Sequence, residues 1–124
     1  MQILLIGLGG FLGALARHGV DSWVRSWVQH PIPFGIMAVN VTGSFAVGLV
    51  FGLLAENTAI SPEFRAPLMV GFLGAYTTFS TLAIDTWRLA EEGAFGHAAA
   101  NLLGSVLLGL VAVVIGLVVG RSLT

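Results

Sequence analysis

The stretch Ala66–Ile84, APLMVGFLGAYTTFSTLAI, runs for 19 residues without a charged side chain. Three further stretches share this property: Phe34–Leu54 with 21 residues, Ala98–Gly120 with 23 and Met1–Ala16 with 16. A helix rises about 1.5 Å per residue, so about 20 apolar residues cross a hydrocarbon core of about 30 Å. The sequence therefore predicts an all-α integral membrane protein with four transmembrane helices.

The composition excludes several classes of protein. The chain has 124 residues, of which 56% are hydrophobic and 9% are charged, whereas a soluble domain has about 25% charged residues. Its five basic residues are all arginines, and they form no basic patch for nucleic acid. Cysteine is absent, which excludes disulfides and thiolate metal sites. We therefore exclude an ordinary soluble enzyme, a disordered chain and a nucleic-acid binder.

Prolines, glycines and charges predict where the four helices end. The first apolar run, Ile3–Ala16, has no basic residue before it, so we expect it to be retained rather than cleaved as a signal peptide. Apolar residues continue at helical spacing to Val28, where His30–Pro33 ends the helix. Pro62 suits the first turn of the third helix. The remaining predicted bounds are a loop over Ala55–Glu63, a third helix ending near Glu91–Gly93 and a fourth helix over Phe95–Gly120.

The arginines give almost no preference for one orientation in the membrane. Four helices place both termini on one side, which then carries Arg65 and Arg121. The other side carries Arg17, Arg25 and Arg88. The positive-inside rule needs an excess to choose a side. Two readings follow: a single, weakly determined orientation, or dual topology, in which copies insert both ways up and pair as an antiparallel dimer.

Small and polar residues form stripes along the predicted helices. Four-residue spacing places Asn40 and Ser44 on one face with Gly48 and Gly52. Glycines at this spacing let two helices approach closely, so helix packing is a sufficient explanation for them. An uncompensated amide in hydrocarbon is costly. For Asn40 and for Asn101 we therefore weigh a functional role against a hydrogen bond between helices.

The centre of the third helix is the most polar part of any predicted span. Gly71–Thr81 contains two glycines and four hydroxyl residues, a poor composition for a helix. A break at membrane depth is tolerated where it is buried in protein or lines a watery path. The carbonyls at such a break can coordinate a cation, the amides attract an anion, and the ring edge of Phe79 is electropositive. The alternative is a polar seam between helices.

Arg17 is the one charge expected inside the membrane. It either anchors the helix at the interface or makes an electropositive vestibule that concentrates anions. The runs Met1–Ala16, Phe34–Leu54 and Ala98–Gly120 contain no carboxylate. This absence argues against a proton-coupled pump with a central acidic carrier.

Three motifs give the chain a resemblance to a known family. Gly9–His18, Val39–Phe45 and Gly71–Thr81, which holds the specific Thr-Thr-Phe-Ser-Thr run, resemble the Fluc/CrcB family of small dual-topology fluoride channels. The length and the four-helix pattern extend the similarity over the whole chain. The resemblance implies that residues 1–124 form one four-helix transmembrane channel domain with a broken third helix. It also implies a multi-pass protein of the cell membrane that lets fluoride leave passively and is not an enzyme.

The family pattern further implies an assembly and a site. The expected partners are the fluoride ion, the lipid bilayer and a second, antiparallel copy of the chain. The expected cofactor is one structural sodium ion on the dimer axis, held by the backbone carbonyls of Gly74 and Thr77 from each subunit. The residues expected along the fluoride path are Asn40, Phe79, Ser80, Thr81, Ser105 and Arg17.

The chain departs from the family pattern at four positions. Leu82 stands where the family has a second phenylalanine, Ala75 replaces a common glycine, Asp85 replaces a glutamate, and Asn101 aligns with a tyrosine. Some family members pair two different subunits, and Leu82 and the arginine distribution leave a heterodimer open for this chain. Two competing functions are a coupled transporter of the small multidrug-resistance type, which needs a first-helix glutamate that this chain lacks, and a structural membrane subunit.

Overall fold

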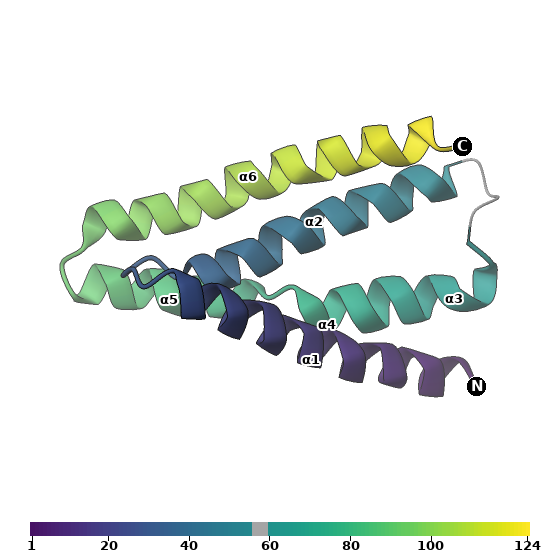
Figure 1. Cartoon of the computed structure of the whole chain (residues 1–124), viewed down its shortest axis with the longest axis horizontal. Coiled ribbons are helices and arrows are strands. Elements are labelled where there is room, and N and C mark those ends of the chain that lie inside the picture. Colours follow the sequence, from purple (N-terminus) through teal and green to yellow (C-terminus); the bar gives the residue numbers. More distant parts are fainter. Residues whose placement is uncertain (56–59) are drawn as a thin grey trace.

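The structure is a computed structural model, and it describes residues 1–55 and 60–124. Within these residues, four helical spans are long and apolar enough to cross a membrane (Figure 1). Three are single helices: α1 (Gln2–Trp27), α2 (Phe34–Leu54) and α6 (Phe95–Ser122). The third span consists of four pieces: α3 (Pro62–Ala66), η1 (Pro67–Leu73), α4 (Gly74–Tyr76) and α5 (Phe79–Glu91). The prediction of an all-α protein with four transmembrane helices is confirmed.

The helices begin and end within two residues of the predicted bounds: α3 starts at Pro62, inside the predicted loop, and α6 runs to Ser122, past the predicted end at Gly120. α1 stops at Trp27, before the Pro31 and Pro33 linker, and α2 starts directly after that linker. α5 ends at Glu91, and Gly93, two residues further on, has a φ of 77°. The end is closed by bonds from Gly93 N–H to the Ala90 carbonyl (3.0 Å) and from Ala94 N–H to the Leu89 carbonyl (2.8 Å). Both termini lie at the same end of the molecule (Figure 1). Residues 56–59 of the predicted loop lie outside the described residues.

Glycines hold α2 and α6 in close contact. α2 packs chiefly against α6. A Cβ at Gly48 would collide with the Val113 carbonyl, and one at Gly116 would collide with the Phe45 carbonyl. Gly52 and Gly120 meet in the same way one turn further along. The helix-packing explanation therefore holds for these glycines.

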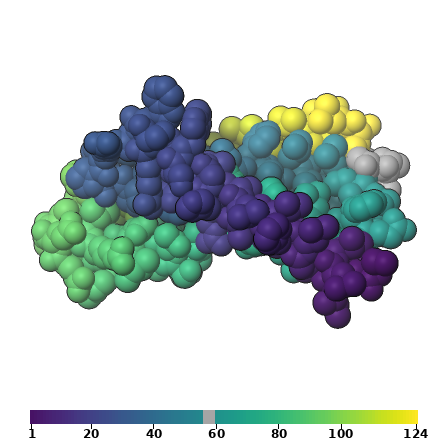
Figure 2. Space-filling model, turned by 60° about the horizontal axis from the view of Figure 1, so that its bottom comes forward, coloured from purple at the N-terminus to yellow at the C-terminus, as the bar shows by residue number. Residues whose placement is uncertain are grey.

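A second glycine contact joins α1 to the first half of the third span. A Cβ at Gly9 would collide with the Pro67 carbonyl, and one at Gly13 would collide with the Phe72 carbonyl. α1 therefore lies directly on η1, and it crosses the middle of the third span diagonally (Figures 1 and 2). These two packed pairs, α2 with α6 and α1 with η1, leave the break in the third span between them.

Candidate functional site

The third span is interrupted at Thr77 and Thr78. Both residues have extended backbone, with ψ of 156° and 114° respectively. The break thus lies at the end of the predicted Gly74–Thr77 stretch, because Gly74–Tyr76 still form a helical turn, α4. The Thr78 hydroxyl caps the new helix by accepting a bond from Thr81 N–H at 3.2 Å. α5 consequently begins with the amides of Phe79 and Ser80, which lack helical partners.

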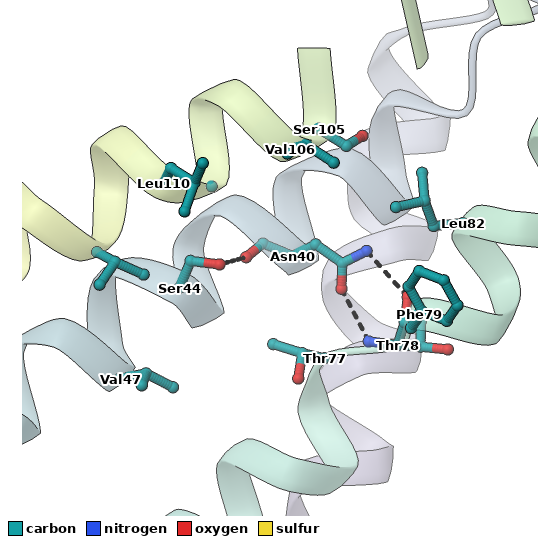
Figure 3. A pocket seen from close by; sticks show the side chains of 12 residues that line it. Asn40, Ser44, Val47, Thr77, Thr78, Phe79, Leu82, Ser105, Val106 and Leu110 are labelled. Atoms are coloured by element: carbon teal, nitrogen blue, oxygen red, sulfur yellow. Dashed lines mark hydrogen bonds between the residues drawn. The ribbon is translucent and has the colours of Figure 1, made fainter. Parts of the chain in front are cut away.

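Asn40 on α2 satisfies the broken backbone. Its Nδ2 donates to the Thr78 carbonyl at 3.1 Å, and its Oδ1 accepts from Thr78 N–H at 2.8 Å (Figure 3). Thr78 N–H is therefore turned away from the Gly74 carbonyl, its partner in a continuous helix. The cross-helix hydrogen bond weighed for Asn40 is present, and it uses one of the two hydrogens on Nδ2. The second hydrogen has no partner among the described residues.

A groove of about 380 Å³ lies beside the break. α2, α5 and α6 supply its walls, and Asn40, Phe79 and Ser105 lie on it together (Figure 3). The structure thus brings together three of the side chains predicted for the anion path. The complete lining is Asn40, Ser44, Val47, Thr77, Thr78, Phe79, Leu82, Ser105, Val106, Gly109, Leu110 and Val113.

Most hydroxyl hydrogens at the groove are already used. The Ser44 hydroxyl donates to the backbone carbonyl of Asn40 at 2.7 Å, and the Thr77 hydroxyl donates to the backbone carbonyl of Leu73 at 3.1 Å. Thr78 donates to the Thr81 hydroxyl at 3.1 Å. The Ser105 hydroxyl is buried and has no hydrogen-bond partner within the described residues. Ser105 and Asn40 are therefore the lining side chains with an N–H or O–H that has no partner among the described residues, although the Ser105 oxygen itself is buried.

Phe79 and Leu82 form the α5 wall of the groove. Phe79 is 79% exposed, the highest fraction among the phenylalanines of the described residues. Leu82 is buried, one turn further along. Leu82, which stands where the family has a second phenylalanine, thus lines the same groove as Phe79. Leu82 has no aromatic edge that could face an anion.

The other predicted path residues lie at the edge of the groove or away from it. Ser80 and Thr81 share the first turn of α5 with Phe79, and both hydroxyls lie within 3.3 Å of the Thr78 hydroxyl. Neither belongs to the lining found in the part of the chain that the structure describes. Arg17 is also absent from this lining. It is half-buried on α1, roughly 15 Å along the helix before Trp27, which places its charge within the span.

The predicted sodium ligands lie on the α4 side of the break. Gly74 is exposed, and a Cβ there would meet its nearest neighbour, the Met69 carbonyl, at 3.6 Å. Because Thr78 N–H donates to Asn40, the Gly74 carbonyl loses its helical partner. Thr77 has extended backbone, so it also leaves the helical bonding pattern. Backbone carbonyls freed in this way suit a hard cation, and in donor chemistry they fit sodium.

Sequence reasoning did not single out Thr78. Its side chain caps α5, its backbone binds Asn40, and it is 8% exposed. A threonine just before the Phe-Ser-Thr run has the pattern of an N-cap, and that signal was present in the sequence. Asn101, the second amide in a predicted span, is 1% exposed and donates to the Thr86 hydroxyl at 3.0 Å. For this amide too the cross-helix hydrogen bond is present.

Comparison with known proteins shows the family. Residues 4–117 match the family described as "CrcB-like protein, Camphor Resistance (CrcB)". The chain is 46% identical to the "Fluoride-specific ion channel FluC" of Solibacter usitatus over 98% of this chain and 99% of that protein. It is 42% identical to the protein of the same name from Acidobacterium capsulatum, over 99% of this chain and 98% of the relative.

A third similar protein is longer. The "Fluoride-specific ion channel FluC" of Methylococcus capsulatus is 44% identical over 99% of this chain, which spans 54% of the length of that relative. Family match, identity and coverage agree with the four spans and with the polar break in the third. This chain belongs to the CrcB family.

Proposed function

We propose that this chain is the subunit of a fluoride-selective channel that lets fluoride leave the cell passively. Its relatives are named fluoride-specific ion channels over nearly the full length of this chain. The observation that carries the proposal is the groove with two uncommitted donors, Asn40 Nδ2–H and Ser105 Oγ–H, at the break of a membrane span. Neutral donors bind an anion and also release it. No bond is made or broken, so the protein is a channel and not an enzyme.

Three further features of the groove favour a small anion. The N-terminal amides of α5 lie at Phe79 and Ser80, and a helix N-terminus attracts negative charge. The edge of the exposed Phe79 ring is electropositive. Arg17 adds a positive charge within the α1 span. In this proposal fluoride passes Asn40, Phe79 and Ser105, with the Ser80 and Thr81 hydroxyls beside the path at the first turn of α5 and Arg17 further away on α1.

The proposed unit is an antiparallel homodimer. In one copy the groove is open, and Phe79 and Gly74 are both exposed. The non-helical backbone at Thr77 and Thr78, beside this groove, needs cover from protein or a watery path within a membrane span. A second copy, inserted the other way up, supplies that cover through the same surface.

We also propose that the Gly74 and Thr77 carbonyls bind a structural sodium ion between the two copies. The ion would satisfy carbonyls that no longer have helical partners, and its charge would offset repulsion between anions in neighbouring paths. The test is density on the dimer axis, compared between protein purified in sodium and protein purified in a large organic cation. Equal density in both preparations, or none in sodium, contradicts the site.

The channel itself is tested with the purified single protein in liposomes. We expect fluoride efflux, followed with a fluoride electrode, to be far faster than chloride efflux from matched vesicles. Equal fluxes would contradict the selectivity. No flux from the single protein, with flux restored by a second subunit, would show a heterodimeric channel. Efflux of an organic cation driven by a proton gradient would instead favour the coupled transporter.

A further inference from the structure

A chain of two hydrogen bonds links α6 to the wall of the groove through α5. Asn101 on α6 donates from Nδ2 to the Thr86 hydroxyl on α5 at 3.0 Å. The Thr86 hydroxyl in turn donates to the Leu82 carbonyl at 2.8 Å. Asn101 is 1% exposed, so the amide end of the link is buried, whereas Thr86 is half-buried.

The link lies one helical turn away from the groove on both helices. Leu82 and Thr86 are four residues apart on α5, and Leu82 lines the groove. Ser105 and Asn101 are four residues apart on α6, and Ser105 lines the groove. Asn101 is not part of the lining that the described residues form. Its amide is therefore committed to α5, whereas the hydroxyl of Ser105 is uncommitted.

We infer that Asn101 is a positioning residue, which fixes the distance between Leu82 on α5 and Ser105 on α6 and does not contact the anion. The inference rests on the proposed fluoride channel. α5 is joined to α2 at its start, where Asn40 holds Thr78. Among the side-chain hydrogen bonds of the described residues, the Asn101–Thr86 bond alone joins α5 to α6.

The size of the effect follows from the strength of such a bond. Hydrogen bonds between helices in a membrane protein contribute only modestly to stability, because the separated helices also find partners. Removing the bond therefore leaves a folded protein. It releases α5 to shift on α6, where the remaining contacts are apolar and non-directional. The first property to change is the width of the path at Leu82 and Ser105, and with it the preference for fluoride over the larger chloride.

The experiment measures fluoride and chloride efflux from liposomes that contain the purified full chain. Thr86→Val removes the hydroxyl at nearly constant volume, and Asn101→Leu removes the amide. We expect each to lower the fluoride-to-chloride ratio by roughly threefold, the effect of one interhelical hydrogen bond. The double variant should lower it no further, because both changes break the same link. Thr86→Ser keeps the hydroxyl and should behave as the unaltered chain. Thr124→Val, the same chemical change at the exposed C-terminus, is the control.

Two outcomes would overturn the inference. Loss of flux in Asn101→Leu with an unaltered ratio in Thr86→Val would make Asn101 a direct contact of the anion. Lower thermal stability in both variants with an unaltered ratio would reduce the link to a structural role. If Asn101→Leu does not fold, Thr86→Val and Thr86→Ser decide alone. Fluoride efflux from the unaltered chain is measured first. Its absence would contradict the proposed function, whereas the ratios of the variants test the role of Asn101.

Discussion

Individual side chains at the groove differ in whether their donor hydrogens already have a partner. Ser44 and Ser105 are both serines on neighbouring helices, and both line the groove. Ser44 has given its hydrogen to the Asn40 carbonyl, as helical serines commonly do. Ser105 has not, although it is buried. A buried hydroxyl without a partner costs free energy in the empty site, and it regains this cost when it donates to an anion.

This difference predicts an effect of Ser105→Ala that separates stability from flux. Since the hydroxyl has no partner to lose, we expect the thermal unfolding temperature in detergent to stay the same or to rise. Fluoride flux should fall, because a donor of the path is gone. Ser44→Ala is the matched control and should leave more flux than Ser105→Ala. A Ser105→Ala channel with full flux would remove Ser105 from the path.

Asn40 permits a second prediction at the same scale. Asn40→Asp keeps the shape of the side chain but removes the donor to the Thr78 carbonyl and places a negative charge at the path. In a site of low dielectric that charge repels an entering anion strongly. We expect fluoride flux to be abolished while the dimer still elutes intact in size-exclusion chromatography. Gln29→Glu, which adds the same charge in the exposed α1–α2 linker, should conduct normally. Normal flux in Asn40→Asp would return Asn40 to a packing role.

At the scale of helices, the bounds of the spans could be predicted, and the details of the third span could not. Pro31, Pro33 and Gly93 end helices through local backbone geometry, which a sequence displays directly. The break was predicted from weak helix propensity, but propensity is lowest at Gly74, which is helical, and so it does not mark Thr77 and Thr78 as the break. Its place at Thr77 and Thr78 depends on Asn40, which is 38 residues away in the chain.

The same distinction applies to the candidate site. Asn40 and Phe79 were predictable because an amide in hydrocarbon and a conspicuous motif stand out in the sequence. The partner of Asn101 was not, because it depends on how far α5 is rotated on α6. The π-helical turns of η1, where α1 lies against the backbone, also lacked a signal in the sequence. Features set by contact between elements thus escaped prediction.

The close contact between α2 and α6 predicts how much stability is lost when a methyl group is added at a glycine in that contact. In Gly116→Ala the new Cβ meets the Phe45 carbonyl, and backbone atoms cannot move aside cheaply. We expect a loss of about 1–3 kcal/mol in the free energy of unfolding, as for other overpacked sites. Gly96→Ala on the same helix, where nothing lies within 4 Å, is the control. Thermal unfolding in detergent measures both, and equal stability of the two variants would contradict the close contact.

At the scale of the whole molecule, a single copy leaves its functional surface uncovered. The two pairs of spans are closely packed within one copy, because glycine contacts join α2 to α6 and α1 to η1. The groove between them is open, with Phe79 at its rim. The lipid-facing side of α6 is aliphatic, as a surface in contact with lipid should be, and includes Leu103, Leu107 and Val111. The groove, with the broken backbone and the Asn40 amide beside it, is therefore where the proposed second copy would pack.

The charge distribution predicts how the two copies insert. Both termini lie at one end of the structure, so Arg65 and Arg121 oppose Arg17, Arg25 and Arg88. With two arginines against three, neither orientation is strongly favoured. We expect both to occur in the cell membrane in comparable amounts. Because the chain has no cysteine, a cysteine added after the last residue is a unique label for a membrane-impermeant maleimide.

Adding arginines to one end of the chain should give variants that insert in one orientation only. These variants test whether the channel needs both orientations. Gln2→Arg, Ser122→Arg and Thr124→Arg together raise the count of arginines at the terminal end to five against three, and Gln29→Arg with Glu92→Arg raises the count at the opposite end to five against two. The first variant should insert with its termini inside and the second with them outside. An antiparallel channel predicts that each variant alone loses fluoride efflux from cells and that co-expression restores it. If all unaltered copies label from one side, or if either variant conducts alone, the functional unit is not an antiparallel pair of this chain.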